Sequence, residues 1–134
     1  MVCVYCESPT KVTNSRLQRR QNNIWRRRQC SVCSSIFTTR EYAELETALM
    51  VEDSTKRLTP FSRDKLFITV YESCKHRPDA VLDAGGIVQT IIKHIIDNQK
   101  DGVVQRRDIV LAALKVLGRF DQTAAAVYAA YHPV

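Results

Sequence analysis

Apolar residues recur with helical spacing through the second half of the chain, and they predict four helices. The first follows Pro60 with Ser62 as its N-cap and stops before Pro78. The second is expected to begin after Gly85-Gly86, and Asp121 can cap the fourth. The apolar positions are, helix by helix, Leu66, Phe67, Val70, Tyr71 and Cys74; Ile87, Val88, Ile91, Ile92, Ile95 and Ile96; Ile109, Val110, Ala113, Leu114 and Leu117; and Ala124, Val127, Tyr128 and Tyr131. Such stripes indicate core packing rather than function.

Two shorter apolar runs predict strands in the same region. Residues 48–51 form one run, and Val103-Val104 is a brief extended piece between the second and third helices. Residues 45–134 are therefore expected to form a mainly helical domain with a little strand, and Cys74 is expected to be a small core residue.

The first 44 residues have a different pattern, because they contain few large apolar residues. Nearly all of them are Val12, Leu17, Ile24, Trp25, Ile36 and Phe37. A segment of this length cannot bury enough apolar surface to fold unaided and usually needs a metal or disulfides. The sequence thus predicts an α+β chain of two domains, residues 1–44 and 45–134.

Four of the five cysteines form two Cys-x-x-Cys pairs, Cys3/Cys6 and Cys30/Cys33, with 23 residues between them. Two such turns offer four thiolates to one tetrahedral zinc ion, as in a zinc ribbon. The N-terminus shows no secretory signal pattern, so we expect a cytosolic protein, in which structural disulfides are uncommon. A thioredoxin-type pair would need a βαβ unit, and none is predicted here. An iron–sulfur cluster remains an alternative to one Zn²⁺ per chain.

Charge is concentrated at the same end of the chain. Residues 1–40 hold eight Lys/Arg against one acid, a net charge of +7, whereas residues 41–134 have a net charge of −1. Asn22-Asn23 predicts the turn of a β-hairpin whose second strand would place Trp25 and Arg27 on one face. All seven basic residues from 16 to 40 are arginine, which suits phosphate and guanine recognition. The candidate DNA contacts are Arg16, Arg26, Arg27 and Arg28; a solubilising basic face is the alternative.

The chain resembles the NrdR family of bacterial repressors of ribonucleotide reductase genes. The residues that carry the resemblance are Cys3-x-x-Cys6, Lys11-Val12, Ser15-Arg16, Arg26-Arg27-Arg28-Gln29-Cys30-x-x-Cys33, Phe37-Thr38-Thr39 and Glu41. Family members often have glycine after the knuckles. Here Glu7 and Ser34 stand in those places, so these turns must form without glycine.

The resemblance implies that residues 45–134 form an ATP-cone, a nucleotide-sensing domain. The first strand, Pro60-Phe61 with Lys65-Leu66, Arg77-Pro78, and the closing Leu117, Asp121 and Ala124 fit its outline. In the hairpin after the strand, Glu52-Asp53-Ser54-Thr55 replaces the family's basic residue and glycine, and the last helix lacks the usual arginine. The candidate nucleotide contacts are Lys56, Arg57 and Lys65, with ordinary surface cations as the alternative.

The function that the resemblance implies is a cytoplasmic bacterial repressor that binds double-stranded promoter DNA. ATP and dATP would regulate it by changing its homo-oligomeric state. The other hypothesis is a zinc-ribbon adaptor for protein or RNA whose helical domain no longer senses nucleotide. We expect neither an enzyme nor a membrane protein, because no nucleophile–base pair, phosphate-cradling glycine loop or apolar run of about 20 residues is present.

Overall fold

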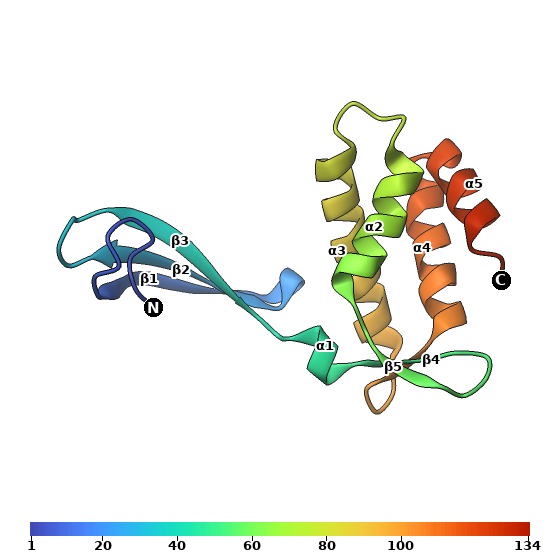
Figure 1. Ribbon diagram of the computed structural model, residues 1–134, viewed down its shortest axis with the longest axis horizontal. Coiled ribbons are helices and arrows are strands. Elements are labelled where there is room, and N and C mark those ends of the chain that lie inside the picture. Colours follow the sequence, from blue (N-terminus) through green and yellow to red (C-terminus); the bar gives the residue numbers. More distant parts are fainter. The chain divides into compact units, whose positions relative to one another are not determined.

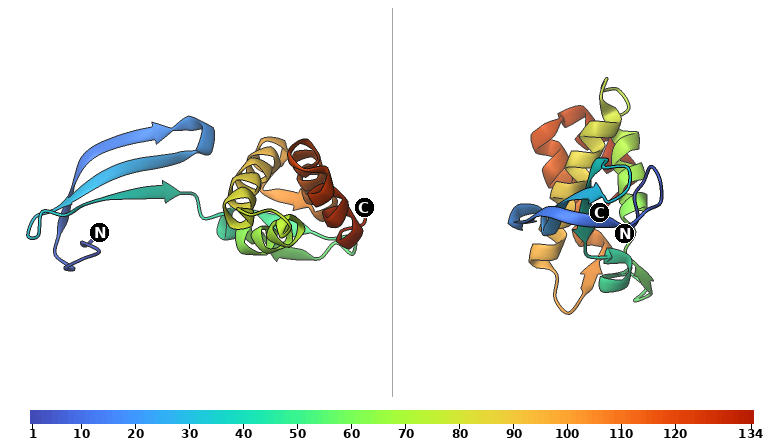
Figure 2. Two further views of the ribbon diagram at one scale, coloured as in Figure 1. Left: turned by 90° about the horizontal axis from the view of Figure 1, so that it is seen from above. Right: turned by 90° about the vertical axis from the view of Figure 1, so that its left-hand side faces the viewer.

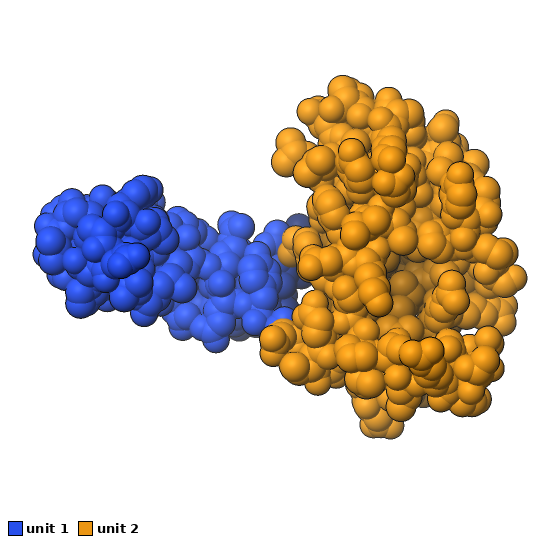
Figure 3. All heavy atoms as spheres, in the orientation of Figure 1, with its two compact units in different colours: residues 1–43 blue, residues 44–134 orange.

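The computed structural model describes residues 1–134 and divides into two compact units, Met1–Ala43 and Glu44–Val134 (Figure 3). The first unit is built from strands and the second mainly from helices (Figure 1). The α+β fold class is therefore confirmed.

Unit 1 is one antiparallel three-stranded sheet in the order β1-β2-β3. Strand β1 spans Thr10–Gln18, β2 spans Asn23–Cys30 and β3 spans Ile36–Tyr42. The predicted hairpin is present: a short 3-10 turn, η1 (Arg19–Gln21), leads to Asn22, whose φ of 46° is the left-handed conformation that asparagine tolerates. The third strand was not predicted, and it makes β2 the central strand of the sheet.

Unit 2 is a four-helix bundle with a small mixed sheet. Its helices are α2 (Arg63–Cys74), α3 (Ala80–Asn98), α4 (Arg106–Phe120) and α5 (Gln122–Tyr131). Each helix packs against the next and α5 packs against α2, so the bundle closes around one core (Figures 1 and 2). The buried residues of this core include Val70, Ile91 and Leu117, which are fully inaccessible to solvent. The prediction for Cys74 is confirmed, since it lies in the same core.

The sheet of unit 2 lies at one end of the bundle, with strand order β5-β4-β6 (Figure 1). A short helix, α1 (Leu45–Ala48), leads into β4 (Met50–Glu52), which pairs antiparallel with β5 (Leu58–Pro60) and parallel with β6 (Val103–Gln105). Gly102 is required before β6: its φ is +73°, and an added Cβ would lie 2.9 Å from the carbonyl oxygen of Ala48.

Two predicted boundaries are wrong. The strand expected at residues 48–51 begins at Met50, because Ala48 ends α1. Helix α3 begins at Ala80, so Gly85-Gly86 lies inside the helix rather than before it. Glycine costs a helix interior about 1 kcal/mol relative to alanine, and burial of Ala80, Ala84 and Val88 on the same helix outweighs that cost. No helix in either unit has the length and apolar character needed to cross a membrane.

Candidate metal centre and basic surface

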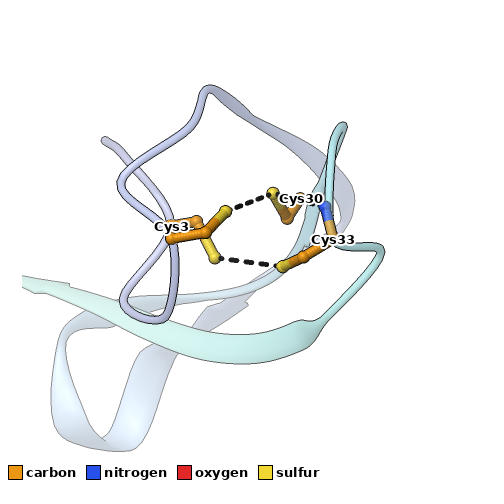
Figure 4. Close-up of side chains that lie close together, drawn as sticks. Cys3, Cys30 and Cys33 are labelled. Atoms are coloured by element: carbon orange, nitrogen blue, oxygen red, sulfur yellow. Dashed lines mark hydrogen bonds between the residues drawn. The ribbon is translucent and has the colours of Figure 1, made fainter.

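The two Cys-x-x-Cys turns of unit 1 bring four sulfur atoms together. The Sγ atoms of Cys3 and Cys33 lie 3.7 Å apart, those of Cys6 and Cys30 lie 3.5 Å apart, and all four lie within 4.8 Å of one another. Figure 4 shows the side chains of Cys3, Cys30 and Cys33 facing a common centre. A tetrahedron with zinc–sulfur bonds of about 2.3 Å has edges of about 3.8 Å, so both the spacing and the donor set fit a zinc ion.

Both cysteine turns close with the same backbone geometry. The amide of Cys3 donates to the carbonyl of Ser8, and the amide of Cys30 donates to the carbonyl of Ser35. Glu7 and Ser34 take left-handed φ angles of 60° and 61°. These are the two positions where family members often have glycine. Each turn therefore forms with a residue other than glycine in the left-handed conformation.

Neighbouring donors favour the thiolate forms of the exposed cysteines. Hydrogen bonds from Ser8 lower the pKa of Cys6 to about 6, and Ser35, whose Oγ lies 3.2 Å from Cys33 Sγ, lowers the pKa of Cys33. Backbone amides of Val32 and Cys33 also approach the Cys30 sulfur, each at 3.4 Å. Thiolate is the form that binds a metal, so Cys6 and Cys33 are suited to bind a cation.

The four candidate DNA contacts are divided between the two faces of the sheet. Arg16 pairs across the strands with Trp25, and its guanidinium lies 5.9 Å from the indole centroid. Strand alternation places Arg27 on that same face and puts Arg26 and Arg28 on the opposite one. The structure therefore does not bring all four arginines to one surface.

The two arginines on the second face are already engaged by neighbours on β3. Arg26 forms an ion pair with Glu41 at 2.5 Å, and the Nε of Arg28 donates to the hydroxyl of Thr39 at 3.1 Å. The sequence did not reveal these contacts, because the third strand was not predicted. For the same reason it missed Arg40, which the register places beside Trp25 opposite Arg16. The run Ile36-Phe37-Thr38-Thr39 consists of β-branched and aromatic residues, and this composition is the signal in the sequence that could have identified the strand.

In unit 2, the three candidate nucleotide contacts lie on two elements. Lys56 and Arg57 are in the β4–β5 hairpin, and Lys65 is in the first turn of α2, where its backbone amide donates to the Ser62 hydroxyl. No hydrogen bond or ion pair joins these three side chains to one another. Lys56 takes a φ of 66°, a conformation that glycine adopts without strain, and pairs with Glu52 at 3.5 Å.

Asp53 organises the tip of that hairpin. Its Oδ1 accepts hydrogen bonds from the backbone amide of Thr55 at 2.8 Å, from the Thr55 hydroxyl at 2.6 Å and from the amide of Arg57 at 3.1 Å. The Thr55 hydroxyl and the Arg57 amide lower the pKa of this carboxyl group, which favours its charged form. Backbone amides that could otherwise bind a phosphate are therefore used by an internal carboxylate.

Two cavities of unit 2 lie elsewhere. One, of about 540 Å³, is lined by residues from the end of α3, β6 and α4, among them His94, Lys100, Gln105 and Lys115. The other, of about 310 Å³, lies between α3 and α4 beside Leu82. Neither is lined by Lys56, Arg57 or Lys65.

Comparison with known proteins agrees with the zinc-ribbon geometry. Residues 1–41 match the family described as "Transcriptional repressor NrdR-like, N-terminal domain". A relative named transcriptional repressor NrdR from Syntrophotalea carbinolica is 32% identical over 125 residues, which are 92% of this chain and 78% of the relative. Relatives of the same name from Tropheryma whipplei and Leifsonia xyli are 34% and 32% identical and are covered over 82% and 83% of their lengths; the alignments span 92% and 98% of this chain. The chain belongs to the NrdR family.

Proposed function

We propose that this chain is a zinc-dependent, DNA-binding repressor of transcription that acts on ribonucleotide reductase genes. The observation that best supports the proposal is one small unit that combines a four-cysteine cluster with an arginine-rich sheet. Relatives that align over nearly the whole chain carry the name transcriptional repressor. The choice of target genes rests on the resemblance to the family.

In this proposal Cys3, Cys6, Cys30 and Cys33 hold one Zn²⁺ per chain. Zinc in a closed site of four thiolates supplies structure and offers no open position for a reaction. The cysteines tie the N-terminal turn to the end of β2 and thereby hold the sheet in shape. The sheet then presents its guanidinium groups to DNA, where each can donate two parallel hydrogen bonds to a phosphate or a guanine edge. The proposed activity is binding, not catalysis.

A unit of 43 residues makes few contacts with DNA. Useful specificity therefore requires several linked copies bound to neighbouring sites. Once one copy is bound, the next is held at a high local concentration near its site, so the assembly binds more tightly than a single copy. We propose that the chain acts as a homo-oligomer.

The test is binding of the zinc-loaded chain to duplex DNA from upstream of the ribonucleotide reductase genes of its own genome, followed by fluorescence anisotropy across a salt series. We expect tighter binding than to a shuffled duplex of the same composition. The log–log salt dependence should have a slope of about −0.9 for each phosphate neutralised. Equal affinity for both duplexes, or no binding to either, contradicts the proposal.

We extend the proposal to control by ATP and dATP, on the resemblance of residues 45–134 to the ATP-cone. A nucleotide that favours one oligomer over another changes DNA affinity without touching the ribbon. The cations available in the expected region are Lys56, Arg57 and Lys65. Sedimentation velocity of the full chain with ATP, with dATP and without nucleotide tests this part. A change in oligomer size with either nucleotide, weakened by Lys65→Ala, is expected.

The Asp53 turn favours the alternative, in which the helical unit supports an adaptor that does not sense nucleotide. Its carboxylate uses the hairpin amides and repels phosphate, and Glu52 already pairs with Lys56. Under this alternative, sedimentation is identical with and without nucleotide. The DNA-binding measurement then distinguishes two cases. Specific DNA binding without a nucleotide effect indicates a repressor that nucleotides do not regulate, and binding to RNA or protein alone indicates an adaptor.

A further inference from the structure

The two faces of the sheet in unit 1 differ in their chemistry. The register assigns every residue to a face, because residues paired across neighbouring strands point the same way and alternate along each strand. A β-bulge at Thr13 shifts the alternation along β1 by one residue, so Lys11 and Asn14 lie on the same face. The first face, called here the cationic face, contains Lys11, Asn14, Arg16 and Gln18 of β1; Asn23, Trp25, Arg27 and Gln29 of β2; and Ile36, Thr38, Arg40 and Tyr42 of β3.

The cationic face carries four basic side chains and no acidic one. Lys11, Arg16, Arg27 and Arg40 are all exposed, and none of their side chains makes a hydrogen bond or an ion pair within the unit. Arg16 and Arg40 flank Trp25 on the two outer strands, and the indole ring holds the Arg16 guanidinium nearby by a cation–π contact. Exposed cations without partners on one face of a sheet are the charge distribution that attracts a polyanion.

The opposite face, called here the mixed face, carries an acidic residue, Glu41, and its arginines have partners. Apolar side chains occur along it, namely Val12, Leu17, Ile24 and Phe37. Its two arginines are half-buried and already have partners: Arg26 is paired with Glu41, and Arg28 donates to Thr39. A guanidinium that must give up an existing partner gains less from binding a phosphate than a free one does.

We infer that the cationic face is the surface that contacts duplex DNA, with Arg16, Arg27 and Arg40 as its principal contacts and Lys11 as an additional phosphate contact. This inference rests on the proposed function and specifies which face of the sheet binds the DNA. Arg26 and Arg28 then serve the sheet, because their contacts with Glu41 and Thr39 join β2 to β3. Two of the four arginines that the sequence indicated are thus assigned to structure.

The test compares single alanine substitutions that each remove one positive charge, either from the cationic face or from the mixed face. Arg27→Ala removes a cation from the cationic face and Arg28→Ala removes one from the mixed face, one residue away. Arg40→Ala and Arg26→Ala provide a second matched pair. Affinity for the promoter duplex is measured across a salt series with the full zinc-loaded chain, and zinc stoichiometry verifies that each variant is folded.

We expect Arg27→Ala and Arg40→Ala each to weaken binding roughly five-fold or more and to reduce the magnitude of the salt slope by about 0.9. Arg26→Ala and Arg28→Ala should leave the slope unchanged. Arg27→Lys, which keeps the charge, should retain the slope and lose only sequence preference.

Two other results are possible, and they have different meanings. If Arg26→Ala or Arg28→Ala reduces the slope as much as its partner in the pair while the parent binds promoter DNA, the choice of face is wrong and the proposed function stands. If the parent itself shows no preference for promoter DNA, the proposed function fails and this inference fails with it.

Discussion

The two units of this chain are stabilised in different ways. Unit 2 has one continuous core of seventeen buried hydrophobic residues drawn from all four long helices and the small sheet. Unit 1 contributes nothing to that core, and its only buried residues are Cys3, Cys30 and Asn23. Two of those three are cysteines of the cluster. Packing can therefore account for the fold of unit 2, whereas the fold of unit 1 depends on what its cysteines bind.

This difference also separates the surfaces available for recognition. A sheet without a core leaves most side chains of both faces accessible, so nearly every residue of unit 1 can take part in binding. Unit 2 uses the inner surfaces of its helices for packing and leaves only their outer surfaces free. A small unit held together by a metal can therefore use most of its residues for recognition, because few of them are needed for the fold.

The largest expected effect comes from removing the metal. A structural zinc site contributes about 10–16 kcal/mol of binding free energy in small zinc-finger peptides. Stripping zinc with a chelator, or substituting Cys30→Ser, should unfold unit 1 and leave unit 2 folded. The chain supplies a separate probe for each unit: Trp25 is the only tryptophan and lies in unit 1, and every α-helix lies in unit 2. Tryptophan emission should shift toward that of an unfolded chain while far-ultraviolet circular dichroism keeps its helical signal.

The control for this prediction is the fifth cysteine. Cys74→Ala changes a buried thiol of unit 2 that lies outside the cluster, so zinc stoichiometry should stay at about one per chain. If the emission of Trp25 does not change when zinc is lost, unit 1 has another source of stability and the contrast between the units is wrong.

The next effect concerns the packed core. Ile91 lies on α3 with no exposed surface, and Ile91→Ala should lower the free energy of unfolding of unit 2 by about 2–5 kcal/mol through lost burial and a cavity. Urea denaturation followed by circular dichroism measures it. Leu82→Ala on the same helix is the matched control, because Leu82 is 77% exposed and should cost less than about 0.5 kcal/mol. Tryptophan emission in native buffer should be identical in both variants; a change would mean that the two units fold together.

The sequence predicted the two sources of stability because both leave local signals. The Cys-x-x-Cys spacing is a chemical requirement that can be read directly, and the apolar stripes of α2, α4 and α5 follow the helical repeat. The N-caps Ser62 and Asp121 accept from the backbone amides of Lys65 and Ala124, as their positions indicated.

The features that were missed depend on contacts between distant residues. Strand β3 has too few apolar residues for its pattern to be noticed, and only its pairing with β2 makes it a strand. The same pairing determines which arginines are free and which have partners. At the start of α3, a local rule about glycine was overridden by packing from residues that precede it. The acidic composition of the β4–β5 hairpin could be read from the sequence, but the use of its amides by Asp53 could not.

The smallest expected effect tests one carboxylate of unit 2 through pH. Asp121 accepts from the amide of Ala124 at 3.0 Å, and its other oxygen accepts from His76 Nε2 and Arg77 Nη1, both at 2.9 Å. These interactions, the Ala124 amide first, hold the pKa of Asp121 well below its usual range. Because the folded pKa lies below the unfolded one, the stabilisation is present above the unfolded pKa of about 4 and is lost progressively as pH falls from there through the lower folded pKa.

Asp121→Asn keeps an oxygen for the helix cap and removes the charge, so it isolates this contribution. At neutral pH the variant should melt at a lower temperature than the parent, and the gap should narrow below about pH 4, as thermal melts followed by circular dichroism would record. Asp97→Asn, which breaks an exposed pair with Lys93, should change the melting temperature less at neutral pH. A gap between parent and Asp121→Asn that stays constant from neutral to acidic pH would mean that the cap, and not the charge of Asp121, stabilises this end of the bundle.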